Sequence, residues 1–113
     1  MESNRQKKVG RLIQKDLSDI FLKDSKLYYR GIMISITHVF VAKDFSLAKV
    51  YLSLFPNDKK EEIFASINSR KFIIKHQLSL KLKNQMRKTP DLAFFLDNSL
   101  EHYENIDRIL KDI

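Results

Sequence analysis

Seven cationic side chains lie between residues 70 and 88, with no carboxylate among them. The segment that follows, 91–113, reverses the sign, with six acidic residues against two cations, so the net charge of +7 is segregated along the chain. Segregated positive charge on a small protein favours a polyanionic partner, because each neutralised phosphate releases a condensed counterion. The chemistry expected of this segment is phosphate contact, and the alternative is a solvated helix face without a partner.

A second basic group lies near the N-terminus, where three cations follow the i, i+3, i+7 spacing of one helical face. Phosphate contacts by such residues position a protein without reading sequence, so specificity has to come from RNA shape or from a particular ribonucleoprotein site. The two groups together form the predicted electrostatic RNA-binding set: Lys8, Arg11, Lys15, Arg70, Lys71, Lys75, Lys83, Arg87 and Lys88.

Catalytic and metal-binding patterns are missing from the sequence. The histidines His38, His76 and His102 are scattered, and none has a carboxylate or a second histidine at metal-ligand spacing. The two glycines, Gly10 and Gly31, exclude every glycine-rich phosphate loop, and the lack of cysteine excludes thiolate chemistry. We therefore expect that the protein is not an enzyme and that it binds no cofactor, metal or small-molecule substrate.

The aromatic residues leave two interpretations open. In the predicted strand 92–96, Phe94 and Phe95 must point to opposite faces, so at least one of them belongs to the core. Phe95 or Tyr51 is a candidate for stacking on RNA bases, although the Lys/Arg-Gly-aromatic signature of sheet-based RNA binders is absent.

The composition predicts one folded domain over residues 1–113. Hydrophobic residues make up 43% of the chain, with eight Phe and four Tyr, which is typical of a globule rather than a disordered basic tail. No apolar run approaches membrane-spanning length, and residues 1–8 lack the apolar core of a signal peptide. We expect a cytoplasmic monomer that does not enter a membrane.

The first half of the chain must position the N-terminal cations. Apolar residues at three- and four-residue steps predict an amphipathic helix over 4–23, followed by a loop over 23–31. Alternating residues then predict a strand over 32–41, with a bulge or twist near His38, and a second strand over 48–54. The polar turn 43–46 joins these strands into a β-hairpin.

The second half must position the remaining cations. Asp58 with Glu61 is typical of a capping box at the start of a helix, and the register of its apolar stripe predicts a break near 69–71. Thr89-Pro90 is expected to stop the second of these helices, before the strand 92–96. A further capping box, Asn98 with Glu101, predicts a last helix over 103–113. The fold class is therefore α+β, with helices covering one face of a three-stranded sheet.

Three segments carry a family resemblance: KVGRLIQKDLSDI at 8–20, ITHV at 36–39 with KDFSLAKVYLS at 43–53, and TPDLAFFLDNS at 89–99. In order and spacing they resemble the bacterial ribosome-binding factor A family across nearly the whole chain. The resemblance implies a KH-like fold of the second type, α-β-β-α-α-β, plus a C-terminal helix. It also implies a non-enzymatic assembly factor that binds the immature small (30S) ribosomal subunit. Such a factor assists late maturation of 16S rRNA near its 5′-terminal helix and is associated with growth in the cold.

The chain departs from that family at the predicted helix break. The family marks this step with Ala-x-Gly, whereas residues 68–72 read NSRKF, without glycine. Either the helix kinks without glycine or it is straighter than in its relatives, which leaves the exposure of Arg70 and Lys71 open. No Gly-x-x-Gly loop exists either, so an RNA clamp of the ordinary KH type is not expected.

A function of another class also fits the sequence. Because no base-reading motif is present, the basic face is also compatible with a protein-interaction module that binds an acidic protein partner. The two hypotheses differ in their response to nuclease, since only a protein partner would survive removal of RNA.

Overall fold

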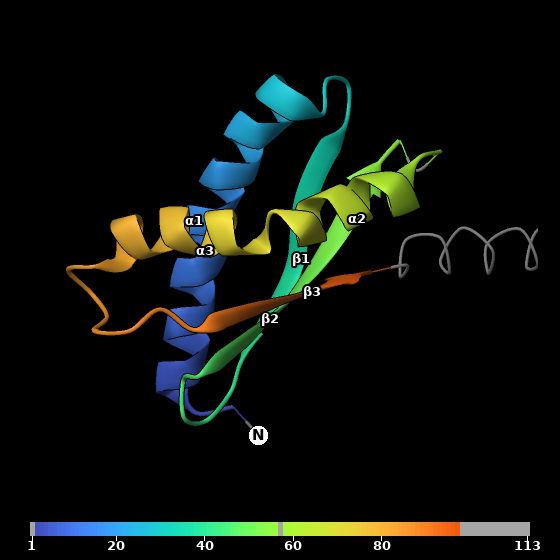
Figure 1. The fold of residues 1–113 in the computed structure, drawn as a ribbon. Coiled ribbons are helices and arrows are strands. Elements are labelled where there is room, and N and C mark those ends of the chain that lie inside the picture. Colours follow the sequence, from blue (N-terminus) through green and yellow to red (C-terminus); the bar gives the residue numbers. More distant parts are fainter. Residues whose placement is uncertain (1, 57, 98–113) are drawn as a thin grey trace, which may run out of the picture.

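The computed structural model describes residues 2–56 and 58–97 of the chain. Six elements follow the predicted order (Figure 1): α1 (Asn4–Tyr28), β1 (Met33–Val41), β2 (Leu47–Phe55), α2 (Lys60–Ser69), α3 (Lys71–Leu82) and β3 (Asp91–Leu96). The predicted α+β class with the order α-β-β-α-α-β is therefore confirmed. The predicted capping box at Asn98 and the helix over 103–113 lie outside the described residues.

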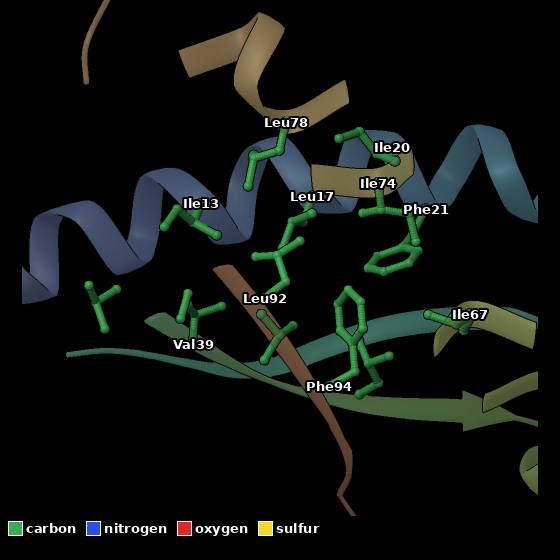
Figure 2. Packing of buried hydrophobic residues seen from close by; sticks show 14 of the residues in the cluster. Ile13, Leu17, Ile20, Phe21, Val39, Ile67, Ile74, Leu78, Leu92 and Phe94 are labelled. Carbon is green, nitrogen blue, oxygen red and sulfur yellow. The ribbon is translucent and has the colours of Figure 1, made fainter. Parts of the chain in front are cut away.

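The sheet has the strand order β1-β2-β3, in which β2 pairs antiparallel with β1 and parallel with β3. The register of the hairpin shifts between Ile36 and His38, which confirms the bulge predicted there. Every second residue of β2 is buried from Ala48 to Leu54, as the alternation predicted. These buried residues face the helices, which lie together on one side of the sheet (Figures 1 and 2).

The hydrophobic core lies between the helices and the sheet (Figure 2). The rings of Phe21 on α1 and Phe94 on β3 meet edge to face, with centroids 5.9 Å apart, so β3 is held directly against α1. Full burial of one such side chain stabilises the fold by about 1.5–3 kcal/mol. Helices and strands both contribute to the labelled part of the core: Ile13, Leu17, Ile20, Phe21, Val39, Ile67, Ile74, Leu78, Leu92 and Phe94.

Helix α1 is longer than the sequence predicted. It continues to Tyr28, so the expected loop over 23–31 is wrong for its first residues. The charged residues after 22 end the apolar stripe, but Asp24 is buried and the hydroxyl of Ser25 donates to the Ile32 carbonyl at 2.5 Å. Polar contacts therefore hold the last turns of α1 in place, and the periodicity of apolar residues in the sequence cannot predict turns that are stabilised in this way.

The edge strand β1 is covered by α1. A Cβ atom at Gly10 would lie 3.1 Å from the Val39 carbonyl oxygen, so the absence of a side chain lets the helix approach the strand closely. Glutamine amides on either side of Gly10 donate to carbonyl oxygens of β1: Gln6 Nε2 to Val41 at 2.8 Å and Gln14 Nε2 to Ile36 at 2.9 Å. These bonds occupy groups that an open sheet edge would present to another chain.

Helix capping differs from the prediction at α2. The helix begins at Lys60 after Lys59, and no side chain caps it, so the capping box predicted at Asp58 is wrong. The capping box of the described chain lies at α1 instead. There Gln6 N–H donates to Ser3 Oγ at 3.1 Å, and Ser3 N–H donates to Gln6 Oε1 at 2.7 Å.

The break between α2 and α3 falls at Arg70, which confirms the interruption predicted over 69–71. Arg70 has φ −101° and ψ 12°, a region that residues other than glycine adopt. Its N–H donates back to the Ile67 carbonyl at 3.1 Å, and its own carbonyl accepts the first bond of α3 from Ile74 N–H at 2.9 Å. The helix therefore kinks without glycine.

Helix α3 ends at Leu82, well before Thr89-Pro90. The Leu82 carbonyl accepts bonds from the N–H groups of Gln85 and Met86, at 2.8 and 2.9 Å, which close a turn. The prediction that Lys83 and Arg87 belong to this helix is wrong. Lys83 caps its C-terminus, and Arg87 lies on the connection to β3. No helix among the described residues is long and apolar enough to cross a bilayer.

Candidate nucleic-acid interface

Three cations stand on the solvent side of α1, and we call Lys8, Arg11 and Lys15 the α1 trio. All three are exposed, while the opposite side of the helix buries Ile13 and Leu17 in the core. Within residues 2–56 and 58–97, no hydrogen bond or ion pair engages any member of the trio. Their charges are therefore available to an external anion.

Arg70 is engaged inside the protein. Its Nη1 donates to Asp24 Oδ2 at 3.1 Å, and its guanidinium carbon lies 4.3 Å from the centre of the Tyr28 ring. Only 18% of the Arg70 side chain and 6% of the Asp24 side chain are exposed. Burial by itself lowers the pKa of Arg70, but hydrogen bonding to Tyr29 and Asp24 outweighs it and raises that pKa. The structure places this predicted site residue in a contact that holds α1 to the helix break.

Three further cations surround Asp91 at the start of β3. Lys75 Nζ donates to Asp91 Oδ1 at 2.6 Å, from a half-buried to an exposed side chain. This hydrogen bond and the charge of Lys75 hold the pKa of Asp91 below its usual value, and Lys88 and Lys71 lower it further. With three cations against one carboxylate, this edge of the sheet remains positive.

A separate hollow joins the start of α1 to the connection between α3 and β3. Arg5, Arg87 and Lys88 line it together with Phe45, and the Arg5 guanidinium carbon lies 5.1 Å from the centre of the Phe45 ring. The sequence prediction omitted Arg5, although it lies three residues before Lys8 on the same helix. Arg87 and Lys88 are exposed, as is Lys83 nearby in the chain.

The hollow also contains one carboxylate, Asp44, in the hairpin turn. Ser46 donates to Asp44 Oδ1 from its hydroxyl at 2.6 Å and from its backbone N–H at 3.1 Å. These bonds lower the pKa of Asp44, with a small contribution from the charge of Lys88. The Asp44 carboxylate is thus ionised and hydrogen-bonded to Ser46 within its own turn. The hollow contains three cations and this one carboxylate, so its net charge is positive.

The histidines stay apart in the described part of the chain. His38 lies on β1 with its Nε2 3.9 Å from Glu2 Oε1, and His76 is exposed on α3, whereas His102 lies outside the described residues. Among residues 2–56 and 58–97, no group of three His, Cys, Asp or Glu side chains is arranged to hold a metal ion.

Comparison with known proteins decides the family. The family model described as Ribosome-binding factor A matches residues 5–110. The chain belongs to the ribosome-binding factor A family. The family member from Christiangramia forsetii is 45% identical over 111 residues, which cover 97% of this chain and 85% of the relative. The Flavobacterium psychrophilum member is 48% identical over 111 residues, with the same coverage of both chains. The resemblance seen in the sequence is thereby confirmed.

Solved structures of the family share the fold. The crystal structure of ribosome-binding factor A from Thermus thermophilus is similar with a TM-score of 0.65 and 18% identity, covering 80% of this chain and 93% of its own. A Thermus thermophilus homology model, fitted into the cryo-EM map of a 30S complex of that factor, gives a TM-score of 0.60 and 18% identity. The match covers 87% of this chain and 97% of that one.

Proposed function

We propose that this protein is an assembly factor that binds the free or immature small (30S) ribosomal subunit. It assists late maturation of 16S rRNA near the 5′-terminal helix and supports growth in the cold. It acts as a cytoplasmic monomer, without catalysis and without a cofactor. Membership of the ribosome-binding factor A family supports this proposal, as does the Thermus thermophilus relative that was fitted into a 30S complex.

The α1 trio is the observation that carries the proposed binding mode. Lys8, Arg11 and Lys15 span about 10 Å of one helix at 1.5 Å per residue. No described residue forms an ion pair with them, so their charged groups are free to contact an approaching phosphate backbone. Binding through such contacts releases counterions and is therefore strongly dependent on salt.

The remaining predicted residues contribute unequally in this proposal. Lys83, Arg87 and Lys88 extend the phosphate-binding surface along the connection between α3 and β3. Lys71 and Lys75 are weaker contributors because both are half-buried and lie within reach of the Asp91 charge. Arg70 shapes the helix break rather than the RNA contact, because Asp24 and Tyr28 already engage its guanidinium.

The test is co-sedimentation of the purified protein with isolated small subunits, large subunits and complete ribosomes, at low and moderate salt. We expect selective binding to free small subunits. The triple variant Lys8→Glu/Arg11→Glu/Lys15→Glu should lose it. A matched variant, Lys23→Glu/Lys26→Glu/Arg30→Glu, makes the same charge change in the last turns of α1 and the turn that follows, and it should retain most binding.

Circular dichroism must show that both triple variants remain helical. Equal binding to small subunits, large subunits and complete ribosomes would show that the basic surface binds polyanions without specificity. Unchanged subunit binding by the α1 trio variant would remove these residues from the interface. A partner that survives nuclease treatment, with no subunit bound, would instead favour the protein-interaction function.

A further inference from the structure

A row of aromatic side chains crosses the face of the sheet that the helices leave open. His38, Tyr51 and Phe95 are direct cross-strand partners on β1, β2 and β3. The ring centroids are 6.2 Å apart from His38 to Tyr51 and 5.3 Å apart from Tyr51 to Phe95, and the second pair is stacked with an interplanar angle of 25°. The row therefore forms one continuous strip over all three strands.

The strip is accessible in the described part of the chain. α1, α2 and α3 cover the other face, where Phe94 is buried in the core (Figure 2). Its neighbour Phe95 retains 41% of its exposure, and the His38 side chain retains 59%. The two aromatic residues of β3 thus divide between core and open face, as strand geometry requires.

A cation lies in the row of side chains next to the strip. In the neighbouring row, Lys49 pairs with Phe40 on β1, and both side chains are exposed on the same face. Two acids border the strip. Glu2 lies 3.9 Å from the His38 ring nitrogen, and Asp97 accepts a hydrogen bond from the Thr37 hydroxyl at 2.5 Å. Lys49 lies two residues before Tyr51 on β2, and Asp97 lies two residues after Phe95, so the cation and this acid lie at opposite sides of the Tyr51–Phe95 pair.

We propose that Tyr51 and Phe95, with Lys49 beside them, form a platform on which unpaired RNA bases stack. Every base offers a π-face to an aromatic ring, so such a platform binds single strands with little sequence preference, while a nearby cation contacts the backbone. This surface lies on the opposite side of the sheet from the α1 trio. It deepens the proposed function, because it assigns single-stranded RNA to one face and phosphate contacts of structured RNA to the other.

Cross-strand aromatic pairs also stabilise sheets, so the test must separate packing from base stacking. Binding of a short single-stranded RNA is compared with binding of an abasic ribose-phosphate oligomer of equal length, using the full chain. We expect wild type to prefer the RNA that carries bases. In Tyr51→Leu/Phe95→Leu, leucine retains apolar packing, and affinity for this RNA should fall about ten-fold or more, with little change for the abasic oligomer.

Two control variants complete the design. Phe72→Leu removes an exposed phenylalanine from α3, on the other side of the sheet, and should leave the preference for bases intact. Lys49→Gln should weaken the binding of both oligomers to a similar degree, because it removes a positive charge but no aromatic ring. Thermal unfolding shows whether each variant is folded at the temperature of the assay, and the ratio of the two affinities is independent of a partial loss of active protein.

The result that overturns the proposal is equal affinity of the intact chain for the two oligomers, or a preference that survives in Tyr51→Leu/Phe95→Leu. Sedimentation velocity tests the competing occupant, a second copy of the chain. A wild-type dimer that the leucine variant converts to monomer would assign the strip to self-association and reject the RNA platform. Neither failure affects small-subunit co-sedimentation, so the proposed function is tested separately.

Discussion

The guanidinium of Arg70 donates a hydrogen bond to the carboxylate of Asp24 across 3.1 Å, and this contact ties the break between α2 and α3 to the last turns of α1. The Tyr28 ring lies beneath the same guanidinium at 4.3 Å, so α1 provides both an ionic and an aromatic partner. A helix break without glycine is thereby fixed by a contact distant in the sequence.

Removal of the guanidinium should be costly for folding. Arg70→Met leaves the Asp24 carboxylate buried without its cation, and we expect the free energy of unfolding to fall by about 3 kcal/mol. Urea denaturation followed by circular dichroism measures the loss. Lys71→Met removes the next cation in the chain, which is half-buried, and serves as the control. A loss no larger than that of Lys71→Met would show that the ion pair does not fix the break.

The side-chain amide of Gln6 gives a second prediction, because it makes two hydrogen bonds: its Nε2 donates to the Val41 carbonyl, and its Oε1 accepts from the Ser3 N–H. Gln6→Glu keeps the acceptor but places a carboxylate against the Val41 carbonyl, so we expect destabilisation by about 2 kcal/mol at neutral pH. Burial beside that carbonyl raises the folded-state pKa of the new glutamate, so the penalty should shrink as acid protonates it. Thermal melts from neutral to acid pH measure this, with the more exposed Gln14→Glu as control.

Much of the fold was predictable because its signals are local. The alternation of β2, the opposite directions of Phe94 and Phe95, and the break near Arg70 all follow from side-chain periodicity. The capping box of α1 was also readable, since Ser3 and Gln6 have the required spacing, although the sequence interpretation passed over it.

The candidate site was less predictable, because its differences arise from contacts between distant segments. Arg70 and Lys8 are both cations, and nothing in the sequence near either one shows that Asp24 pairs with Arg70 alone. The sequence predicts a loop at Asp24, because a charged residue does not continue the apolar stripe of a helix; the structure instead buries this carboxylate on α1. Helical periodicity placed Lys83 on α3, but the turn at Leu82 closes the helix first.

The ion pair between Lys75 and Asp91 should make a small, pH-dependent contribution to stability. Its cation lowers the folded-state pKa of Asp91 from the ordinary value of 3.8. The stabilisation is therefore complete above that value and is lost as the pH falls through the lower folded-state pKa. Asp91→Asn should melt slightly below wild type at neutral pH, and the two melting curves should converge in strong acid. A difference that persists there would assign the effect to packing.

The salt dependence of RNA binding distinguishes phosphate contacts from structural cations. Each cation that contacts a phosphate adds about 0.7 to 0.9 to the slope of log affinity against log salt concentration. Lys8→Gln/Lys15→Gln should therefore reduce the slope by about 1.5 for structured RNA from the small subunit. Arg70→Gln should leave it nearly unchanged, because Asp24 already neutralises that charge in the folded protein. Fluorescence anisotropy over a salt series measures both slopes. A reduction by Arg70→Gln equal to that of a trio residue would place Arg70 at the RNA, and would require the contact with Asp24 to open on binding.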